Sequence, residues 1–220
     1  EDDTDNAGQL VSSLLNITDV DSGADSGMAI YGQAVGRGGW QYSTDGGVNW
    51  NDLSGKDFRS KVVALAKGLV AAGIQPGQAV AIMSRTRFEW TLIDFAIWYA
   101  GGCVVPIYDT SSAEQIDWIL NDSHSVAIIV ETPALADLVK TVQPSHTRHM
   151  WTMTEDVLTV LREAGKHIGD DEIDRRRNAV TPASLATLIY TSGTTGKPKG
   201  VQLTHSNFLS ECGNVVQGAS

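Results

Sequence analysis

Cysteine is nearly absent from this sequence, and its scarcity limits the kind of protein the chain can be. Only Cys103 and Cys212 occur in 220 residues, too few and too far apart for a disulfide framework or a cysteine metal site. Cys103 lies in an apolar run, where a thiol behaves as a small buried hydrophobe. The pattern favours a reduced, cytoplasmic setting for residues 54–220.

Long hydrophobic runs and targeting signals are missing as well. The longest apolar stretch, from Phe95 to Tyr108, is interrupted by Gly101, Gly102 and Pro106. It is too short and too interrupted to cross a bilayer, and no signal peptide is visible. The first residue is not Met, which leaves a processed form or a fragment of a longer protein open.

Basic residues are scarce in the first quarter of the chain. Residues 1–53 carry nine acidic side chains and one basic one, a net charge of −8, whereas residues 54–220 carry 17 and 15, a net charge of −2. The total of −10 disfavours nucleic acid as a partner. The step in composition predicts a boundary near residue 50, with a β-rich acidic segment over 1–50 and a different domain over 51–220.

Residues 54–220 alternate between helical and extended hydrophobic patterns. The alternation is typical of an α/β fold, a parallel sheet flanked by helices. Ligands of such sheets bind at the carboxyl ends of the strands. Helices are predicted at 58–72, 88–102, 133–142 and 155–165, and strands at 79–83, 103–108, 126–131, 148–153 and 185–190. A further helix is predicted to run to Leu120, with either Ser111 or Ser112 as its cap.

The polar stretch 166–181 allows two interpretations. Three adjacent arginines, Arg175 to Arg177, suggest a contact with phosphate or anionic lipid. The simpler interpretation is a solvated linker or helix face, because acidic residues at 170, 171, 172 and 174 balance the charge.

The chemically most informative stretch is YTSGTTGKPKGV, from Tyr190 to Val201. It is not a Walker A loop, because only two residues separate Gly193 from Gly196 and Pro198 follows Lys197. Its glycines would still let backbone N–H groups approach an anion, and its hydroxyls and lysines suit a phosphate. The alternative is a plain solvated hairpin loop. The density of such residues after a buried strand favours the phosphate site.

This stretch resembles the phosphate loop of the adenylate-forming superfamily, which includes acyl-CoA synthetases, luciferases and the adenylation domains of peptide synthetases. The resemblance implies that the loop holds the β- and γ-phosphates of ATP. Lys197 falls at a position that the family varies and is left out, and His205 is expected in the first turn of the following helix as a structural residue. The implied ATP-phosphate contacts are Thr191, Ser192, Gly193, Thr194, Thr195, Gly196 and Lys199.

A second stretch narrows the subgroup. VPIYDTSSAEQI, residues 105–116, resembles the long-chain fatty acyl-CoA synthetases rather than peptide-synthetase adenylation domains, which remain the alternative within the superfamily. The resemblance implies an AMP-forming ligase with ATP, Mg²⁺, CoA and a fatty acid as its small molecules. Peripheral membrane contact is compatible with a lipid-like substrate, although no basic amphipathic helix indicates it. The sequence specifies no oligomeric state.

The resemblance also implies machinery outside this chain. Motifs for adenine, ribose and magnesium, and a carboxyl-terminal lysine for the first step, would lie beyond Ser220. No catalytic or metal-binding residue is therefore expected within residues 1–220. The fragment alone is expected to be inactive as a ligase.

The amino-terminal segment resembles a different kind of protein. Residues 19–50 are similar to a repeat unit of bacterial surface or adhesin-type proteins, which would make this part a binding module. Asp19, Asp21 and Asp25 offer oxygen ligands for calcium, although an acidic solvated loop is the simpler interpretation. A fusion of unrelated genes, a natural extension and a coincidence of aromatic hairpins all remain open.

Overall fold

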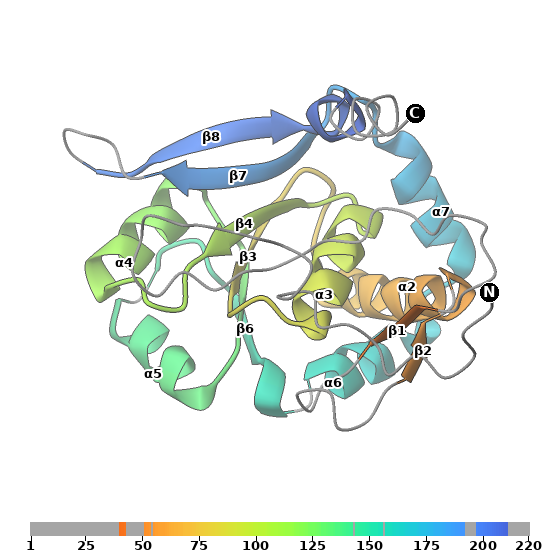
Figure 1. The fold of residues 1–220 in the computed structure, drawn as a ribbon, viewed down its shortest axis with the longest axis horizontal. Coiled ribbons are helices and arrows are strands. Elements are labelled where there is room, and N and C mark those ends of the chain that lie inside the picture. Colours follow the sequence, from red (N-terminus) through yellow and green to blue (C-terminus); the bar gives the residue numbers. More distant parts are fainter. Residues whose placement is uncertain are drawn as a thin grey trace, which may run out of the picture.

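A computed structural model describes residues 40–42, 51–53, 55–142, 144–155, 157–191 and 197–210. Its centre is a six-stranded sheet in the order β6-β5-β3-β4-β7-β8 (Figure 1). The strands are β3 (Ala79–Met83), β4 (Cys103–Ile107), β5 (Ala127–Val130), β6 (His149–Thr152), β7 (Leu185–Thr191) and β8 (Lys199–Thr204). The first five follow the predicted strands, and these five pair in parallel.

The sheet is mostly parallel rather than wholly parallel. Strand β8 was not predicted, and it pairs antiparallel with β7. Only seven residues separate Thr191 from Lys199, whereas a crossover to a parallel strand needs a dozen or more. The short connection therefore forces the chain to turn back along the edge of the sheet.

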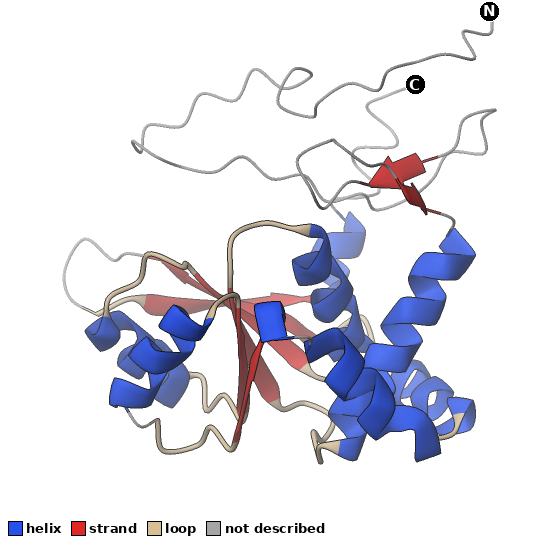
Figure 2. Cartoon of the chain, turned by 90° about the horizontal axis from the view of Figure 1, so that it is seen from below, coloured by secondary structure: helices blue, strands red, loops and turns tan. Residues whose placement is uncertain are grey.

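Helices cover both faces of the sheet, which Figure 2 shows along its edge. On one face, α2 (Gly55–Ala71), α3 (Phe88–Tyr99) and α6 (Val157–Ala164) form one hydrophobic cluster with the sheet. On the other face, α4 (Ala113–Asp122) and α5 (Pro133–Val142) form a second cluster. Strand β3 serves both, since Val80 and Ile82 face the first cluster while Ala81 and Met83 face the second. All five residues of β3 are buried, as expected for a central parallel strand.

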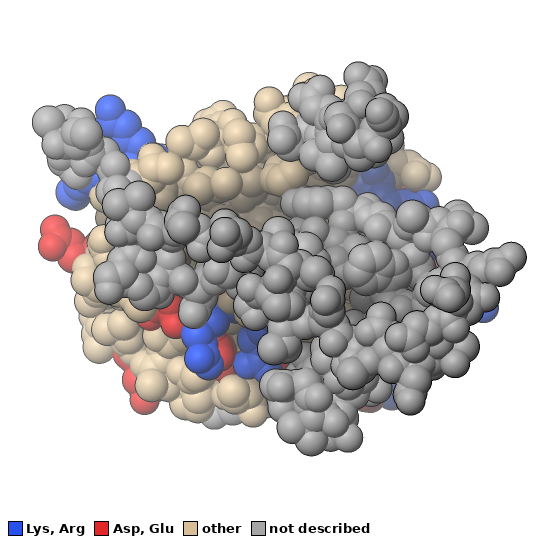
Figure 3. Space-filling view, viewed as in Figure 1, with Lys and Arg blue, Asp and Glu red and all other residues tan. Residues whose placement is uncertain are grey.

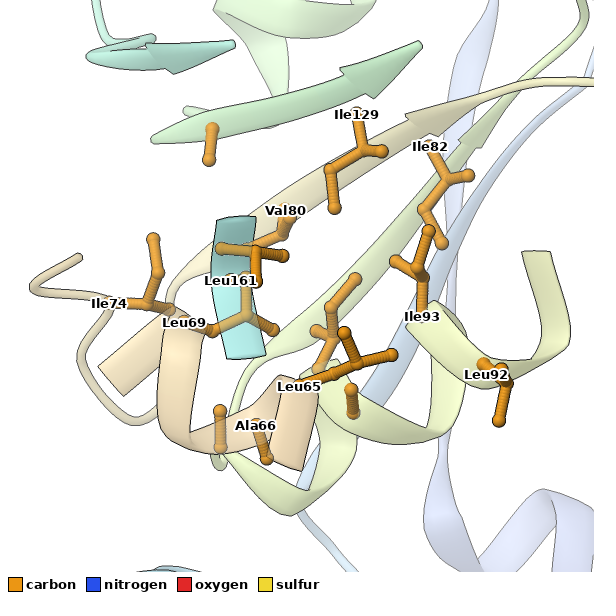
Figure 4. Packing of buried hydrophobic residues seen from close by; sticks show 14 of the residues in the cluster. Leu65, Ala66, Leu69, Ile74, Val80, Ile82, Leu92, Ile93, Ile129 and Leu161 are labelled. Carbon is orange, nitrogen blue, oxygen red and sulfur yellow. The ribbon is translucent and has the colours of Figure 1, made fainter. Parts of the chain in front are cut away.

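The first cluster is closed by an unusually close contact between α2 and the chain around α6. A Cβ added to Gly68 of α2 would lie 2.6 Å from the carbonyl carbon of Leu161. A Cβ added to Gly165, in the short helix η2 (Gly165–His167), would lie 2.5 Å from the backbone nitrogen of Gly68. Leu65, Leu69 and Leu161 fill the space beside this contact (Figure 4). Glycine is needed at both positions for the backbones to approach this closely.

The polar stretch 166–181 forms a helix, α7 (Asp170–Ala179), and not a linker. Arg175 is exposed and pairs with Glu172, as the solvated-face interpretation predicts. Arg176 differs, because only 5% of it is exposed. Its Nη1 donates to the carbonyl oxygens of Ile74 at 2.7 Å and Ala100 at 3.1 Å. Arg176 therefore ties α7 to the turns after α2 and α3, which uses its donors for structure.

Most predictions for the amino-terminal segment lie outside the described residues, including Asp19, Asp21 and Asp25. What is described there is β1 (Trp40–Tyr42), paired antiparallel with β2 (Asn51–Leu53). The boundary near residue 50 stays a prediction. Within the described ranges, no helix combines the length and apolar character that crossing a membrane requires.

Asp94 gives the fold a predicted pH dependence. It lies in α3 with 8% of its surface exposed, and burial raises the pKa of its carboxyl group from 3.8 to about 7. Between these two values the folded state keeps a proton that the unfolded state releases, so the free energy of unfolding falls as the pH rises from about 4 to about 7. The full difference is on the order of 4 kcal/mol, since one pKa unit corresponds to about 1.4 kcal/mol.

We therefore expect Asp94→Asn to become more stable relative to the unchanged protein as the pH is raised from 4 to 8. Urea unfolding at several pH values measures this difference. Asp137→Asn is the matched control, because that carboxylate lies 74% exposed on α5 and should show no comparable trend. A parallel pH dependence of the unchanged protein and Asp94→Asn would contradict the prediction.

Candidate functional site

The candidate site lies at the end of the β7–β8 hairpin, on the carboxyl edge of the parallel strands. Thr191 is the last residue of β7, Lys199 is the first of β8, and the two are direct partners in the ladder. Both are exposed. Ser192, Gly193, Thr194, Thr195 and Gly196 lie outside the described residues. The structure thus brings together the first and last of the predicted phosphate contacts, and their assignment to ATP stays a prediction.

Basic side chains lie at this end of the hairpin in the space-filling view (Figure 3). The described lysines there are Lys197 and Lys199, both exposed. Their positive charge is available to an anion approaching the carboxyl edge of the sheet.

Tyr190 fixes the hairpin just before its loop end. Its ring is 9% exposed, and its hydroxyl donates to Oδ2 of Asp122 in α4 at 2.6 Å. Burial, followed by the hydrogen bond to Asp122, raises the pKa of the Tyr190 phenol, so the group stays a neutral donor. A Cβ added to Gly200 would lie 3.0 Å from Cζ of Tyr190. The glycine opposite Tyr190 therefore makes room for the ring.

The second strand of the hairpin is held by Trp118 of α4. Its indole Nε1 donates to the carbonyl oxygen of Pro198 at 2.8 Å. The ammonium of Lys197 lies 4.1 Å from the centroid of the same indole ring, within the range of a cation–π contact. Sequence reasoning missed Trp118 and Asp122, because nothing local in the sequence links α4 to a loop some 80 residues later. It set Lys197 aside because the family varies that position.

Strand β7 is also fixed by β4 within the sheet and by α3 on the other face of the sheet. Thr187 donates its hydroxyl to the carbonyl oxygen of Val104 at 2.9 Å, and the indole of Trp98 donates to that of Ala186 at 2.9 Å. His205, in the first turn of the helix after β8, packs its ring 5.3 Å from that of Trp98. Burial lowers the pKa of His205, which favours the neutral ring. The structure agrees with the structural role predicted for His205.

A second carboxyl-edge position is filled by protein side chains. The order of strands reverses between β3 and β5, the place where open α/β sheets commonly bind ligands. Glu131, 4% exposed after β5, accepts from the backbone nitrogen of Arg85 at 3.0 Å and from its Nη2 at 2.8 Å. Arg87 adds a longer contact. Hydrogen bonds from Arg85 lower the pKa of Glu131, so an ion pair occupies this point.

Neither the buried thiol of Cys103 nor a surface cavity beside α2 adds a second site. Burial raises the pKa of Cys103 to about 12, so its thiol is protonated and inert, as predicted for a small buried hydrophobe. A cavity of about 600 Å³ lies between α2, η2 and α7, and none of the predicted phosphate contacts lines it. Within the described residues, no group of His, Cys, Asp or Glu side chains could hold a metal ion.

Comparison with known proteins identifies the family to which the chain belongs. The model of the AMP-binding enzyme family matches residues 34–219. The long-chain-fatty-acid–CoA ligase FadD15 of Mycobacterium bovis is 41% identical over 167 residues, which cover 74% of this chain and 28% of that protein. The ligase ACSBG2 of Xenopus laevis is 32% identical and covers 74% of this chain and 23% of that protein. The chain thus spans less than a third of the length of these relatives.

The same fold occurs in a solved relative. A crystal structure of a long-chain-fatty-acid–CoA ligase from Archaeoglobus fulgidus, FadD1, superposes with a TM-score of 0.63 at 25% identity, over 72% of this chain and 31% of that one. The mostly parallel sheet flanked by helices is the fold of the amino-terminal part of adenylate-forming enzymes. The chain belongs to the AMP-binding enzyme family, and its homologues include long-chain fatty acid–CoA ligases.

Proposed function

We propose that the whole protein is an AMP-forming long-chain fatty acid–CoA ligase and that this chain is its amino-terminal, ATP-phosphate-binding part. The observation that carries the proposal is the 41% identity to a long-chain ligase in a chain that has YTSGTTGKPKGV at a strand end. The substrates are a fatty acid, ATP supplied as its magnesium complex, and CoA.

The reaction has two steps. A carboxylate oxygen of the fatty acid attacks the α-phosphorus of ATP, the bond to the bridging oxygen breaks, and pyrophosphate leaves. The CoA thiolate then attacks the acyl carbonyl carbon of the acyl-adenylate, and AMP leaves. Charge accumulates on the leaving pyrophosphate, so fixed donors and cations aimed at it lower the barrier of the first step.

Within this chain, the proposed task is to hold the β- and γ-phosphates. Thr191 and Lys199 face each other across the hairpin and offer a hydroxyl and an ammonium. Ser192, Gly193, Thr194, Thr195 and Gly196 complete the proposed set. We place the protein in the cytoplasm, in peripheral contact with membranes that supply its lipid substrate.

ATP–pyrophosphate exchange by the whole protein tests the proposal. We expect exchange that depends on a long-chain fatty acid, with acyl-CoA formed once CoA is added. Exchange driven by amino acids and not by fatty acids would instead identify a peptide-synthetase type of adenylation enzyme. Residues 1–220 alone are expected to form no acyl-adenylate, and their activity would contradict the proposed division of labour.

A further inference from the structure

One helix contacts the chain on both sides of the glycine-rich segment, residues 192–196. Tyr190, two residues before that segment, donates to Asp122, and Pro198, two residues after it, accepts from Trp118. Trp118 and Asp122 are four positions apart in α4, so they lie one above the other on a single helix face. The two contacts therefore fix the spacing between the strand ends and their position against α4.

The hairpin depends on these contacts because it lies at the edge of the sheet. Among the described strands, β8 contacts only β7, and Thr191, Lys197 and Lys199 are all exposed. Strand β7 pairs with β4 at Thr187, so without contacts to α4 the part of the hairpin beyond Thr187 would be held by its own ladder and free to bend. Binding a polyphosphate at its end would then cost the free energy of ordering it, which preformed contacts reduce.

Helix α4 is well suited to be the support. Its first turn carries a reciprocal cap, in which Ser112 and Gln115 each satisfy a backbone N–H of the other, an arrangement that stabilises a helix start. Ile116 and Leu120 are fully buried against the sheet. The face with Trp118 and Asp122 is thus presented by a helix that is fixed at its amino-terminal end and along its length.

Trp118 also restricts the position of the positive charge of Lys197. The ammonium of Lys197 lies over its ring, next to the glycine-rich segment and two residues from Lys199. Ordering a free lysine side chain around a bound anion costs rotamer entropy. The ring restricts Lys197 to a region at the entrance of the hairpin, where its charge adds to that of Lys199.

We propose that Trp118 and Asp122 are positioning residues for the ATP phosphates, that they act through Pro198 and Tyr190, and that Lys197, held over Trp118, supplies an additional positive charge. This inference rests on the proposed function. It adds three residues that lie outside the set implied by the YTSGTTGKPKGV resemblance.

The test uses Trp118→Phe in the whole protein, since phenylalanine keeps an aromatic ring and removes the N–H donor. One hydrogen bond corresponds to about a five-fold change, so we expect the KM for ATP in pyrophosphate exchange to rise about five-fold. The KM values for fatty acid and CoA should not change. A role in stability alone would lower the melting temperature and leave the KM for ATP unchanged, which would overturn the proposal.

Lys197→Met tests the charge. We expect a rise of a few-fold in the KM for ATP. The effect of Trp118→Leu combined with Lys197→Met should be smaller than the product of the two single effects, because leucine removes the ring that Lys197 contacts. Arg177→Met is the matched control. Arg177 lies on α7, away from the end of the hairpin, and its guanidinium is 5.5 Å from the ring centroid of Tyr99 in α3. Strictly multiplicative effects would overturn the shared role of Trp118 and Lys197.

The proposed function and the positioning role can be disproved separately. If the unchanged protein shows no exchange dependent on ATP and fatty acid, the proposed function is wrong and the inference falls with it. If exchange is present, but Trp118→Phe and Lys197→Met leave the KM for ATP as unchanged as the control Arg177→Met does, only the positioning role is wrong.

Discussion

Lys199→Ala in the whole protein is expected to lower kcat/KM for ATP by roughly 100-fold, the size seen when a group that stabilises developing charge is removed. Lys199 begins β8 directly opposite Thr191, and its exposed ammonium lies at the carboxyl edge where the phosphates are proposed to bind. Pro198 precedes it and limits the backbone, so the position of this charge is set by the chain itself. Pyrophosphate exchange at varied ATP concentration measures the effect.

Two further variants make the result specific to charge at this position. Lys199→Arg keeps the charge but changes its geometry, so it should recover part of the lost activity. Lys140→Ala removes a lysine that pairs with Asp137 on α5, and it should leave kcat/KM for ATP unchanged. A loss smaller than about five-fold for Lys199→Ala would exclude Lys199 as a principal phosphate contact.

The second large effect is expected on stability. Arg176→Met should lower the free energy of unfolding by about 2–6 kcal/mol, because the carbonyl oxygens of Ile74 and Ala100 lose a buried donor, at about 1–3 kcal/mol for each unsatisfied group. Methionine retains much of the apolar stem, so the change isolates the guanidinium. Urea unfolding of the unchanged protein and the variant measures the difference.

The neighbouring arginine supplies the control. Arg175→Met removes a cation that is 66% exposed and bonded to Glu172, and exposed ion pairs contribute little. Its unfolding midpoint should therefore stay close to that of the unchanged protein. Equal destabilisation by Arg175→Met and Arg176→Met would mean that the helix as a whole, and not the buried guanidinium, is responsible.

Elements with a strong local pattern were predicted with their boundaries. The strand at 79–83 and the helix at 133–142 match β3 and α5 residue for residue. Five consecutive apolar residues after a turn favour a buried strand because the run is too short for a typical helix. Pro133 marks a helix start because it lacks only an N–H that would be unpaired there. The capping role of Ser112, one of two serines considered, follows from the Gln three residues later.

Elements without such a pattern were missed or left open. Strand β8 has no fully buried residue, so no apolar alternation marks it, and its pairing with β7 depends on the length of the connection between them. Helix α7 has a sequence rich in charge, and its burial is limited to Ile173 and Arg176. Such elements are stabilised by what they pack against, which a local pattern does not contain.

The sequence by itself determined the α/β class, the buried Cys103 thiol, the YTSGTTGKPKGV motif and the resemblance to long-chain ligases, because each depends on neighbouring residues or on a short motif. Only the tertiary structure decided that Glu131 fills the point of strand reversal, that Arg176 is buried and that α4 supports the hairpin. These contacts join residues between 44 and 102 positions apart. Hydrophobic periodicity extends over a few turns of helix or a single strand, and side chains this far apart meet only when the whole sheet has formed.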